Sequence, residues 1–212
     1  MFPYRKLLFF ILLVAVQPRS VAQQSTAKAF GKVSRPEKWW AITHPFVAGK
    51  AYKLTIKARE ATKEMLNDST IDHDSNGGQL DAFRHSYWMA LLSQKISPRK
   101  AKQLGIAHEK GDYLAFKKHR MEDGALPDSM ASVMDLYNNE TGIAIGKTNK
   151  KLTETELKIL IKQKVLSGEV KVLRKDKDKN YLSCDGAKID LQQYLHQWNI
   201  PKCLADSNTN QR

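Results

Sequence analysis

The chain has 212 residues, of which 42% are apolar and 27% are charged, and its formal net charge is +13 at pH 7. These values exclude a chain that is too short or too polar to bury a core, and they fit one globular domain with some appended structure. The positive charge favours an anionic substrate or partner, such as nucleic acid, anionic lipid or an envelope polymer. Because the Lys and Arg residues are dispersed along the chain, a solvated basic surface is the simpler interpretation of most of them.

The N-terminus has the features of an export signal. A basic start precedes an apolar run over residues 7–16, and small residues at Ser20 and Ala22 fit a signal-peptidase site. The run is about ten residues long, too short to span a bilayer comfortably. We therefore predict a signal peptide over residues 1–22, cleavage near Ala22, no stable transmembrane anchor and export to the periplasm or the medium. An uncleaved N-terminal anchor is the alternative.

Residues 23–46 combine a polar lead-in with a Trp-rich segment. Trp39 and Trp40 are adjacent, and two adjacent side chains cannot both face inward from one helical turn. We predict a brace or lid that packs on the main bundle, with a structural role for His44.

A helical core domain is predicted over residues 47–146. Between Val47 and Met65 the apolar residues recur at steps of three and four, which indicates an amphipathic helix. The segment 79–95 is apolar nearly all round, which is typical of a buried helix. Two more helices are expected, one from Ser97-Pro98 to Arg120 and one from Asp128 or Ser129 to Gly142.

Three of these predicted helices carry polar residues that a structural helix does not need. They are Asp81, Arg84, His85 and Trp88 on the first, His108, Glu109 and Asp112 on the second, and Asp135, Asn138 and Asn139 on the third. Pairs four residues apart lie on one face of a helix. Convergence of the three faces would build a metal site or an acid/base site, whereas a buried ion-pair network that fixes helix packing is the structural alternative.

The candidate metal ligands are His85, His108 and Asp135, because imidazole and carboxylate suit Zn²⁺, Mn²⁺ or Fe²⁺. Such an ion would activate water for attack on an ester. Glu109 is a candidate ligand or general base, and Arg84 could neutralise charge on a phosphate. Without a metal, Asp81 could orient His85 as a general base. Supporting roles are assigned to Trp88, Asp112, Asn138 and Asn139.

Residues 147–212 are predicted to form a C-terminal extension. A helix is expected from Thr153, followed by a β-hairpin of 169–174 with 180–183 and a short helix over 191–198. In an oxidising compartment, Cys184 and Cys203 can form a disulfide whose loop of about 20 residues is worth roughly 3 kcal/mol. The predicted fold is therefore mainly α, a compact helical bundle with a small C-terminal β-hairpin and a short helix.

Three motifs carry a resemblance to known families. Asp81-Ala-Phe-Arg-His-Ser-Tyr-Trp88, Ala107-His-Glu109 and Asp135-Leu-Tyr-Asn-Asn139 resemble an uncharacterised, mostly bacterial domain family of exported proteins and toxin-like modules, which implies a shared site but no defined reaction. The order His85, His108-Glu109, Asp135 is similar to HD-type metal phosphohydrolases, with Glu109 in place of their Asp. Arg84-His85 beside Asp81 is similar to secreted phospholipases A2, with Ser86 where those enzymes place a carboxylate.

Two classes of function follow from the sequence. The first is an exported hydrolase, metal-dependent or not, that acts on a phosphoester, lipid or cell-envelope substrate. The second is a non-enzymatic module that binds an anionic partner through its basic surface and uses the buried polar residues only for structure.

Overall fold

The computed structural model of the protein describes residue 31, residues 33–121 and residues 125–209, and the residues from Ser34 onward form one compact unit. The predicted signal peptide over 1–22 lies outside the described residues. The helices of this unit are α2 (Arg35–Thr43), α3 (Pro45–Met65), α4 (Gln79–Lys95), α5 (Pro98–Phe116), α6 (Ser129–Thr148) and α7 (Glu154–Leu166). None of the helices in the described ranges is long and apolar enough to cross a membrane. The prediction of a mainly α fold is confirmed.

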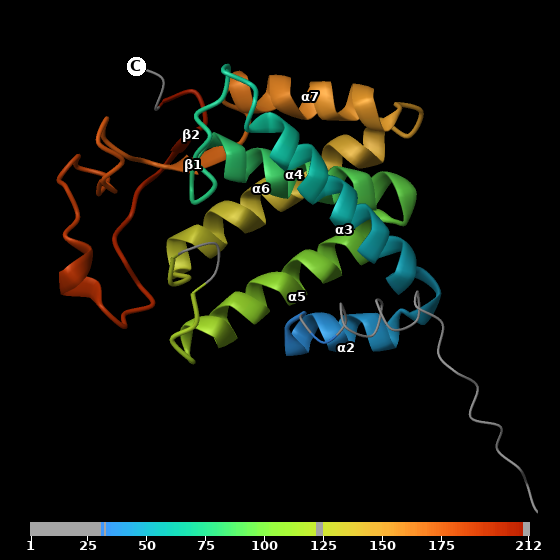
Figure 1. The fold of residues 1–212 in the computed structure, drawn as a ribbon, viewed down its shortest axis with the longest axis horizontal. Coiled ribbons are helices and arrows are strands. Elements are labelled where there is room, and N and C mark those ends of the chain that lie inside the picture. Colours follow the sequence, from blue (N-terminus) through green and yellow to red (C-terminus); the bar gives the residue numbers. More distant parts are fainter. Residues whose placement is uncertain (1–30, 32, 122–124, 210–212) are drawn as a thin grey trace, which may run out of the picture. The chain divides into compact units, whose positions relative to one another are not determined.

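Helix α4 is the centre of the helical part, and α3, α5, α6 and α7 pack around it (Figure 1). Its sequence is apolar on nearly every side, so neighbouring helices can bury it on all of its faces. Phe83, Met89 and Leu91 are completely buried. The polar residues that α4 carries are therefore enclosed with its apolar ones.

Helix α6 approaches α4 closely at two glycines, where any larger residue would clash with the α4 backbone. A Cβ atom added to Gly142 would lie 2.2 Å from the carbonyl oxygen of Ser86, and one added to Gly146 would lie 2.2 Å from that of Ala90. The prediction that Gly142 ends this helix is wrong, because α6 continues to Thr148. This glycine serves as a contact point between two helix backbones rather than as a C-cap.

Capping residues set the N-terminal boundaries of several helices. Ser97, Asp128 and Thr153 accept hydrogen bonds from the first-turn amides of α5, α6 and α7, as their sequence positions predict. The Trp-rich segment is itself a helix, α2, which begins with a capping box between Ser34 and Glu37.

The C-terminal extension contains two short strands, β1 (Lys171–Leu173) and β2 (Leu204–Asp206), which pair antiparallel. The predicted partner segment, 180–183, does not pair with β1, and its bridge lies after that strand, between Lys175 and Tyr181. The ladder is therefore formed by the end of the chain. The short helix is the 3₁₀ helix η1 (Leu191–Tyr194), shorter than predicted.

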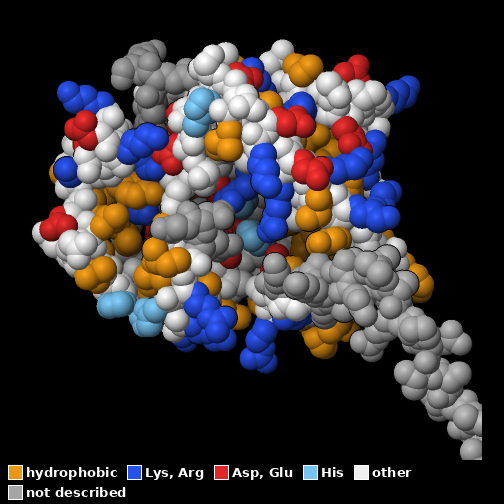
Figure 2. Space-filling view, viewed as in Figure 1, with side chains coloured by type: hydrophobic (Ala, Val, Ile, Leu, Met, Phe, Trp, Pro, Cys, Tyr) orange, Lys and Arg blue, Asp and Glu red, His pale blue; other side chains and the backbone are white. Residues whose placement is uncertain are grey.

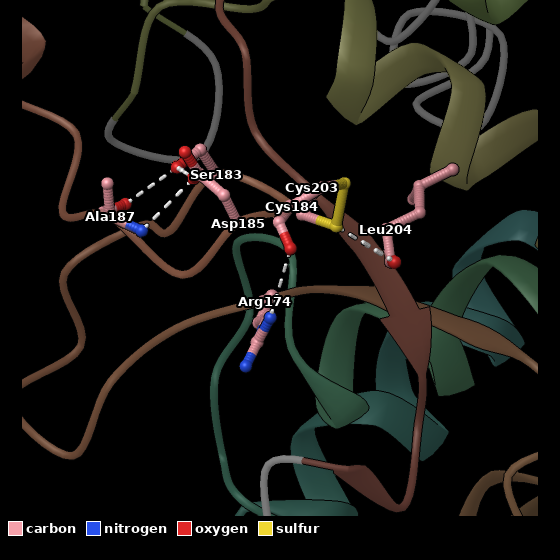
Figure 3. Close-up of a disulfide and its surroundings, with 7 residues drawn as sticks. All are labelled: Arg174, Ser183, Cys184, Asp185, Ala187, Cys203 and Leu204. Atoms are coloured by element: carbon pink, nitrogen blue, oxygen red, sulfur yellow. Dashed lines mark hydrogen bonds between the residues drawn. A yellow bond between two sulfur atoms is a disulfide. The ribbon is translucent and has the colours of Figure 1, made fainter.

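The predicted disulfide between Cys184 and Cys203 is present, and it lies beside this ladder (Figure 3). The backbone amide of Arg174 donates to the carbonyl oxygen of Cys203 at 2.8 Å. The Arg174 guanidinium reaches the carbonyl oxygen of Cys184 at 3.5 Å. These contacts hold the returning end of the chain against the residue that follows β1.

Replacement of Gly142 by Ala tests the contact between α4 and α6. Helix propensity favours Ala over Gly by about 1 kcal/mol. The clash with the Ser86 backbone should outweigh that gain, and we expect a net loss of about 1–3 kcal/mol in the free energy of unfolding. Denaturant titration measures it.

The matched control is Gly49→Ala in α3, because a Cβ atom there meets nothing within 4 Å. This variant should be neutral or more stable. A Gly142→Ala protein as stable as the Gly49→Ala protein would show that the close approach is not required.

Candidate functional site

A cleft of about 700 Å³ lies beside α4 and is lined by residues of α2, α3, α4 and α5. The predicted site residues that line it are Asp81, Arg84, His85, Trp88 and His108. Figure 2 shows a hollow on this face of the molecule, with Lys or Arg and His side chains inside it. A smaller cavity adjoins Asp81 and Arg84 as well, and Asp135 lines it. The predicted residues thus border a space that a ligand can enter.

His85 is buried and held in one protonation state. Its Nδ1 atom lies 3.4 Å from the side-chain oxygen of Asn139, which can only accept, so Nδ1 carries the proton. Burial, and then the charges of Arg84 and His108, lower the pKa of His85 well below its usual value. The ring is therefore neutral, and the lone pair of Nε2 accepts from the Arg84 guanidinium at 3.2 Å.

Two carboxylates face this lone pair. Asp135 Oδ1 lies 3.5 Å from His85 Nε2, and Asp81 Oδ1 lies 3.6 Å from it. These distances are longer than a normal hydrogen bond, and a neutral ring forms no ion pair. Oδ1 of Asp135 accepts no hydrogen bond from the described part of the chain. Three acceptor atoms thus converge, and Asp135 Oδ1 is the one that receives no hydrogen bond from the described residues.

The carboxyl group of Asp135 is poorly stabilised in its charged form. Burial raises its pKa well above the usual value, and the charges of Asp81 and Glu109 raise it further. Asp81 is better provided for, because its Oδ2 accepts the amide of Gly77 at 2.7 Å. Asp135 therefore needs either a proton or a cation at neutral pH.

Arg84 links the buried site to the opening. Its guanidinium donates to Asp81 Oδ1 at 2.7 Å and to His85 Nε2 at 3.2 Å. Its side chain retains 29% exposure, and it lines both cavities. A partly exposed guanidinium at the edge of a cleft is suited to bind an incoming phosphate or carboxylate.

His108 belongs to a second group of charges on α5. Its Nδ1 lies 3.1 Å from Glu37, and its Nε2 lies 3.9 Å from Asp112. Burial lowers its pKa, but the hydrogen bond to Glu37 and the charges of Asp112 and Glu109 outweigh burial and raise the pKa to about 10. His108 is therefore an imidazolium at neutral pH, whereas His85 is not.

The structure brings the predicted residues together but divides them into two groups. Asp81, His85 and Asp135 form one, and His108, Glu109 and Asp112 form the other, with the candidate ligand atoms of each within 4.8 Å of one another. The rings of His85 and His108 are 6.0 Å apart, and Trp88 contacts both edge-on. His85 and Asp135 meet as predicted, but the third acceptor beside them is Asp81, not His108.

The two predicted Asn residues have different partners. Asn139 fixes the ring of His85, as a supporting residue would. Asn138 instead exchanges two hydrogen bonds with the backbone of Lys171, at 2.9 and 2.8 Å, and so binds β1 to α6.

Glu37 is a member of the site that the sequence interpretation missed. Burial raises its pKa, but His108 and the backbone and hydroxyl of Ser34 lower it to about 2, so it is charged. The sequence signal was the Ser34-x-x-Glu37 spacing of a capping box. That spacing predicts the helix start but does not predict a contact with His108.

The C-terminal extension supports the loops around the site. Lys202 Nζ donates to Asp128 Oδ2 at 2.6 Å in a buried pair, and Lys175 Nζ donates to Asp74 Oδ2 at 2.5 Å. Burial lowers the pKa of Lys202, and Asp128 opposes that effect. Both pairs therefore tie the extension to segments that precede α4 and α6.

Comparison with known families assigns the helical domain. A family model described as "Domain of unknown function (DUF6973)" matches residues 38–169, more than half of the chain. The chain belongs to this family, and the predicted membership of an uncharacterised domain family is confirmed. No curated protein and no solved structure matches the chain.

Replacement of Glu37 by Gln should destabilise the protein in a pH-dependent way. The raised pKa of His108 contributes stability that is complete below pH 6.5 and is lost as the pH rises through about 10. The lowered pKa of Glu37 contributes stability above pH 4.5 that is lost as the pH falls through about 2. The loss in Glu37→Gln should thus be largest near pH 5–6, on the order of 3 kcal/mol.

Unfolding titrations at several pH values measure this loss. The control is Glu154→Gln, which removes an exposed ion pair with Lys57 and should cost under about 1 kcal/mol at every pH. An effect of Glu37→Gln that is equally small, or that grows toward pH 10, would contradict the assigned charges.

Proposed function

We propose that the protein is an exported, metal-dependent hydrolase that acts on phosphoesters. The observation that carries this proposal is the convergence of Asp81, His85 and Asp135 on one point beside a cleft that also contains Arg84. A buried set of acceptors is costly unless a cation or proton neutralises it. Arg84 supplies a cation to Asp81 and His85, but Asp135 Oδ1 accepts no hydrogen bond from the described part of the chain. We therefore attribute the arrangement to ligand binding rather than to stability alone.

The spacing of the acceptors fits a transition metal. Two ligand atoms, each about 2.1 Å from a tetrahedral ion, lie ~3.4 Å apart. The distances from His85 Nε2 to Asp135 and Asp81 are 3.5 and 3.6 Å. One imidazole and two carboxylates suit Zn²⁺, Mn²⁺ or Fe²⁺, and three protein ligands leave a position open for water or substrate. The Asn139 contact to Nδ1 is the kind of second interaction that orients a ligating His.

The remaining charges can divide the work of ester hydrolysis. When bound, the ion would lower the pKa of a water molecule toward neutrality. Arg84 would bind the phosphate oxygens, and the imidazolium of His108 would add a second positive charge in the same cleft. Glu109, buried on α5 beside His108, is the proposed proton acceptor. Export is proposed from the N-terminal signal and is consistent with the Cys184–Cys203 disulfide.

A binding module for an anionic partner is the second candidate. The observation that favours it is the formal charge of +13, together with exposed Lys and Arg side chains around the cleft. In that case the buried charges would serve packing alone. The two candidates differ in what the buried residues do, so variants of these residues separate them.

The variant Asp135→Asn should weaken metal binding at least about a hundredfold and reduce hydrolysis of a nitrophenyl phosphodiester to a similar degree. The amide removes a negative ligand while it keeps the volume of the side chain. Metal content after dialysis, measured by mass spectrometry, and turnover with added Zn²⁺ or Mn²⁺ give the two readouts. The control is Glu140→Gln, an exposed α6 residue paired with Lys102. A wild-type protein that holds no metal after reconstitution would leave only the Asp81/His85 pair as a catalytic site.

The variant His85→Ala separates the two candidate functions. A hydrolase should lose turnover by at least about a hundredfold while it keeps its affinity for an anionic ligand, because catalysis depends on the residue more than binding does. A binding module should show no turnover in either protein and should keep its affinity in the variant. Circular dichroism checks the fold, and His119→Ala at an exposed position is the control. Turnover that persists in His85→Ala would contradict the proposed site.

A further inference from the structure

The wall of the cleft formed by α3 changes character along its length. Tyr52, Ile56, Arg59 and Lys63 follow one another at steps of four, three and four residues, so they lie on one face of the helix. Ile56, Arg59 and Lys63 line the cleft. The face is thus apolar toward the start of α3 and cationic toward its end.

The side chains of Arg59 and Lys63 form no ion pair or hydrogen bond in the described part of the chain. The opposite side of α3 differs, because Lys57 pairs with Glu154 and Glu64 pairs with Lys158. With Arg84, the cleft therefore gathers three guanidinium or ammonium groups. The lining also includes Glu37, Glu60 and Asp81. Asp81 pairs with Arg84 and Glu37 pairs with His108, so Glu60 is left to offset part of the charge of Arg59 and Lys63.

Exposed apolar side chains also lie before the apolar end of the wall in the sequence. We use the name α2–α3 ridge for Trp39, Ile42 and Phe46, which are 68%, 60% and 100% exposed. Trp39 and Ile42 lie in α2, and Phe46 lies in the first turn of α3, less than two turns before Tyr52. Large apolar side chains exposed together mark a surface that contacts a partner or a membrane.

We propose, on the basis of the hydrolase function above, that the substrate is an anionic phospholipid that the protein takes from a membrane surface. The α2–α3 ridge enters the interface, as Trp and Phe side chains do at the headgroup level. The phosphate then lies against Arg59, Lys63 and Arg84, and the acyl part lies along the apolar end of the wall. A substrate with one anionic end and one apolar end matches both ends of the cleft.

A nucleic acid fits the same surface less well. Strands bound without a duplex need aromatic faces on which bases stack along a cationic path. Trp88, the aromatic residue that lines this cleft, is buried and donates its ring N–H to Thr55. The most exposed aromatic residues, Trp39 and Phe46, lie on the α2–α3 ridge, away from Arg59 and Lys63 along the chain. The apolar surface would then have no role.

Flotation of the full chain with vesicles tests the proposal. The vesicles are phosphatidylcholine alone or phosphatidylcholine mixed with phosphatidylglycerol, and a chelator is present so that binding is measured without turnover. The double variant Trp39→Ser/Phe46→Ser should bind both vesicle types at least about tenfold more weakly, because binding scales with the apolar area that enters the interface. The control Ile159→Ser, at an exposed position of α7, should bind as wild type does.

A second pair of variants tests the anionic end. Arg59→Gln/Lys63→Gln should lose about tenfold or more in binding to the mixed vesicles and little on phosphatidylcholine alone, because each cation near an anionic surface adds attraction. The control is Lys53→Gln, which is exposed on α3 and does not line the cleft.

The outcomes are distinct. Wild-type binding by the ridge double variant would place any membrane contact elsewhere in the chain, the N-terminal apolar run included, and would overturn the proposal. Complete displacement by inorganic phosphate or by a short oligonucleotide would assign the cleft to a free phosphate or to nucleic acid instead. Vesicle binding that depends on the ridge, in a protein whose Asp135→Asn variant has unchanged turnover, would support the lipid surface and reject the metal site.

Discussion

The backbone contact between α4 and α6 is the constraint on which the site depends. Gly142 lies one turn after Asn139 and two turns after Asp135, so these residues share the α6 face that meets α4. A side chain at Gly142 would meet the carbonyl oxygen of Ser86. The helices would then separate at the residue that follows His85 in the sequence. The 3.5 Å distance between Asp135 and His85 exists only because the helices can touch.

The same packing creates one neutral and one positively charged histidine. His85 lies beside Asp81 and Asp135, but burial and then the charges of Arg84 and His108 lower its pKa, so the ring stays neutral. His108 faces Glu37, Asp112 and Glu109, and their charges overcome burial. Groups whose surroundings move their pKa values apart are typical of sites where one binds a cation or proton and the other holds a charge.

Local patterns predicted more of this structure than long-range contacts did. The periodicity of 47–65, the uniform apolar character of 79–95 and the capping residues of three helices follow from interactions within a few residues, and they were predicted. The role of Gly142 was not, because a glycine late in a helix fits a C-cap or a helix contact equally well. The pairing of β1 with β2 could not be predicted either, since the two strands are far apart in sequence.

The sequence predicted most of the residues that form the site, but not which of them contact one another. Spacing of four residues placed Asp81 and His85 on one face, and the structure shows them there. Which carboxylate meets which histidine depends on helix rotation, and this put Asp81 beside His85 and Glu37 beside His108. Glu37 reaches the site from a helix that is distant from α5 in sequence, so no periodicity within α5 could reveal it. Sequence spacing therefore defines the candidates, and tertiary packing assigns their partners.

The family match stops at residue 169, but residues beyond it also support the site. Asp128 caps α6 through one oxygen and accepts from Lys202 through the other. Lys202 is adjacent to Cys203, whose disulfide fixes it to Cys184. The start of the helix that carries Asp135 is thus held by a cross-linked segment outside the matched domain. The matched region supplies the acceptors, and the extension limits how far the α6 end of the site can move.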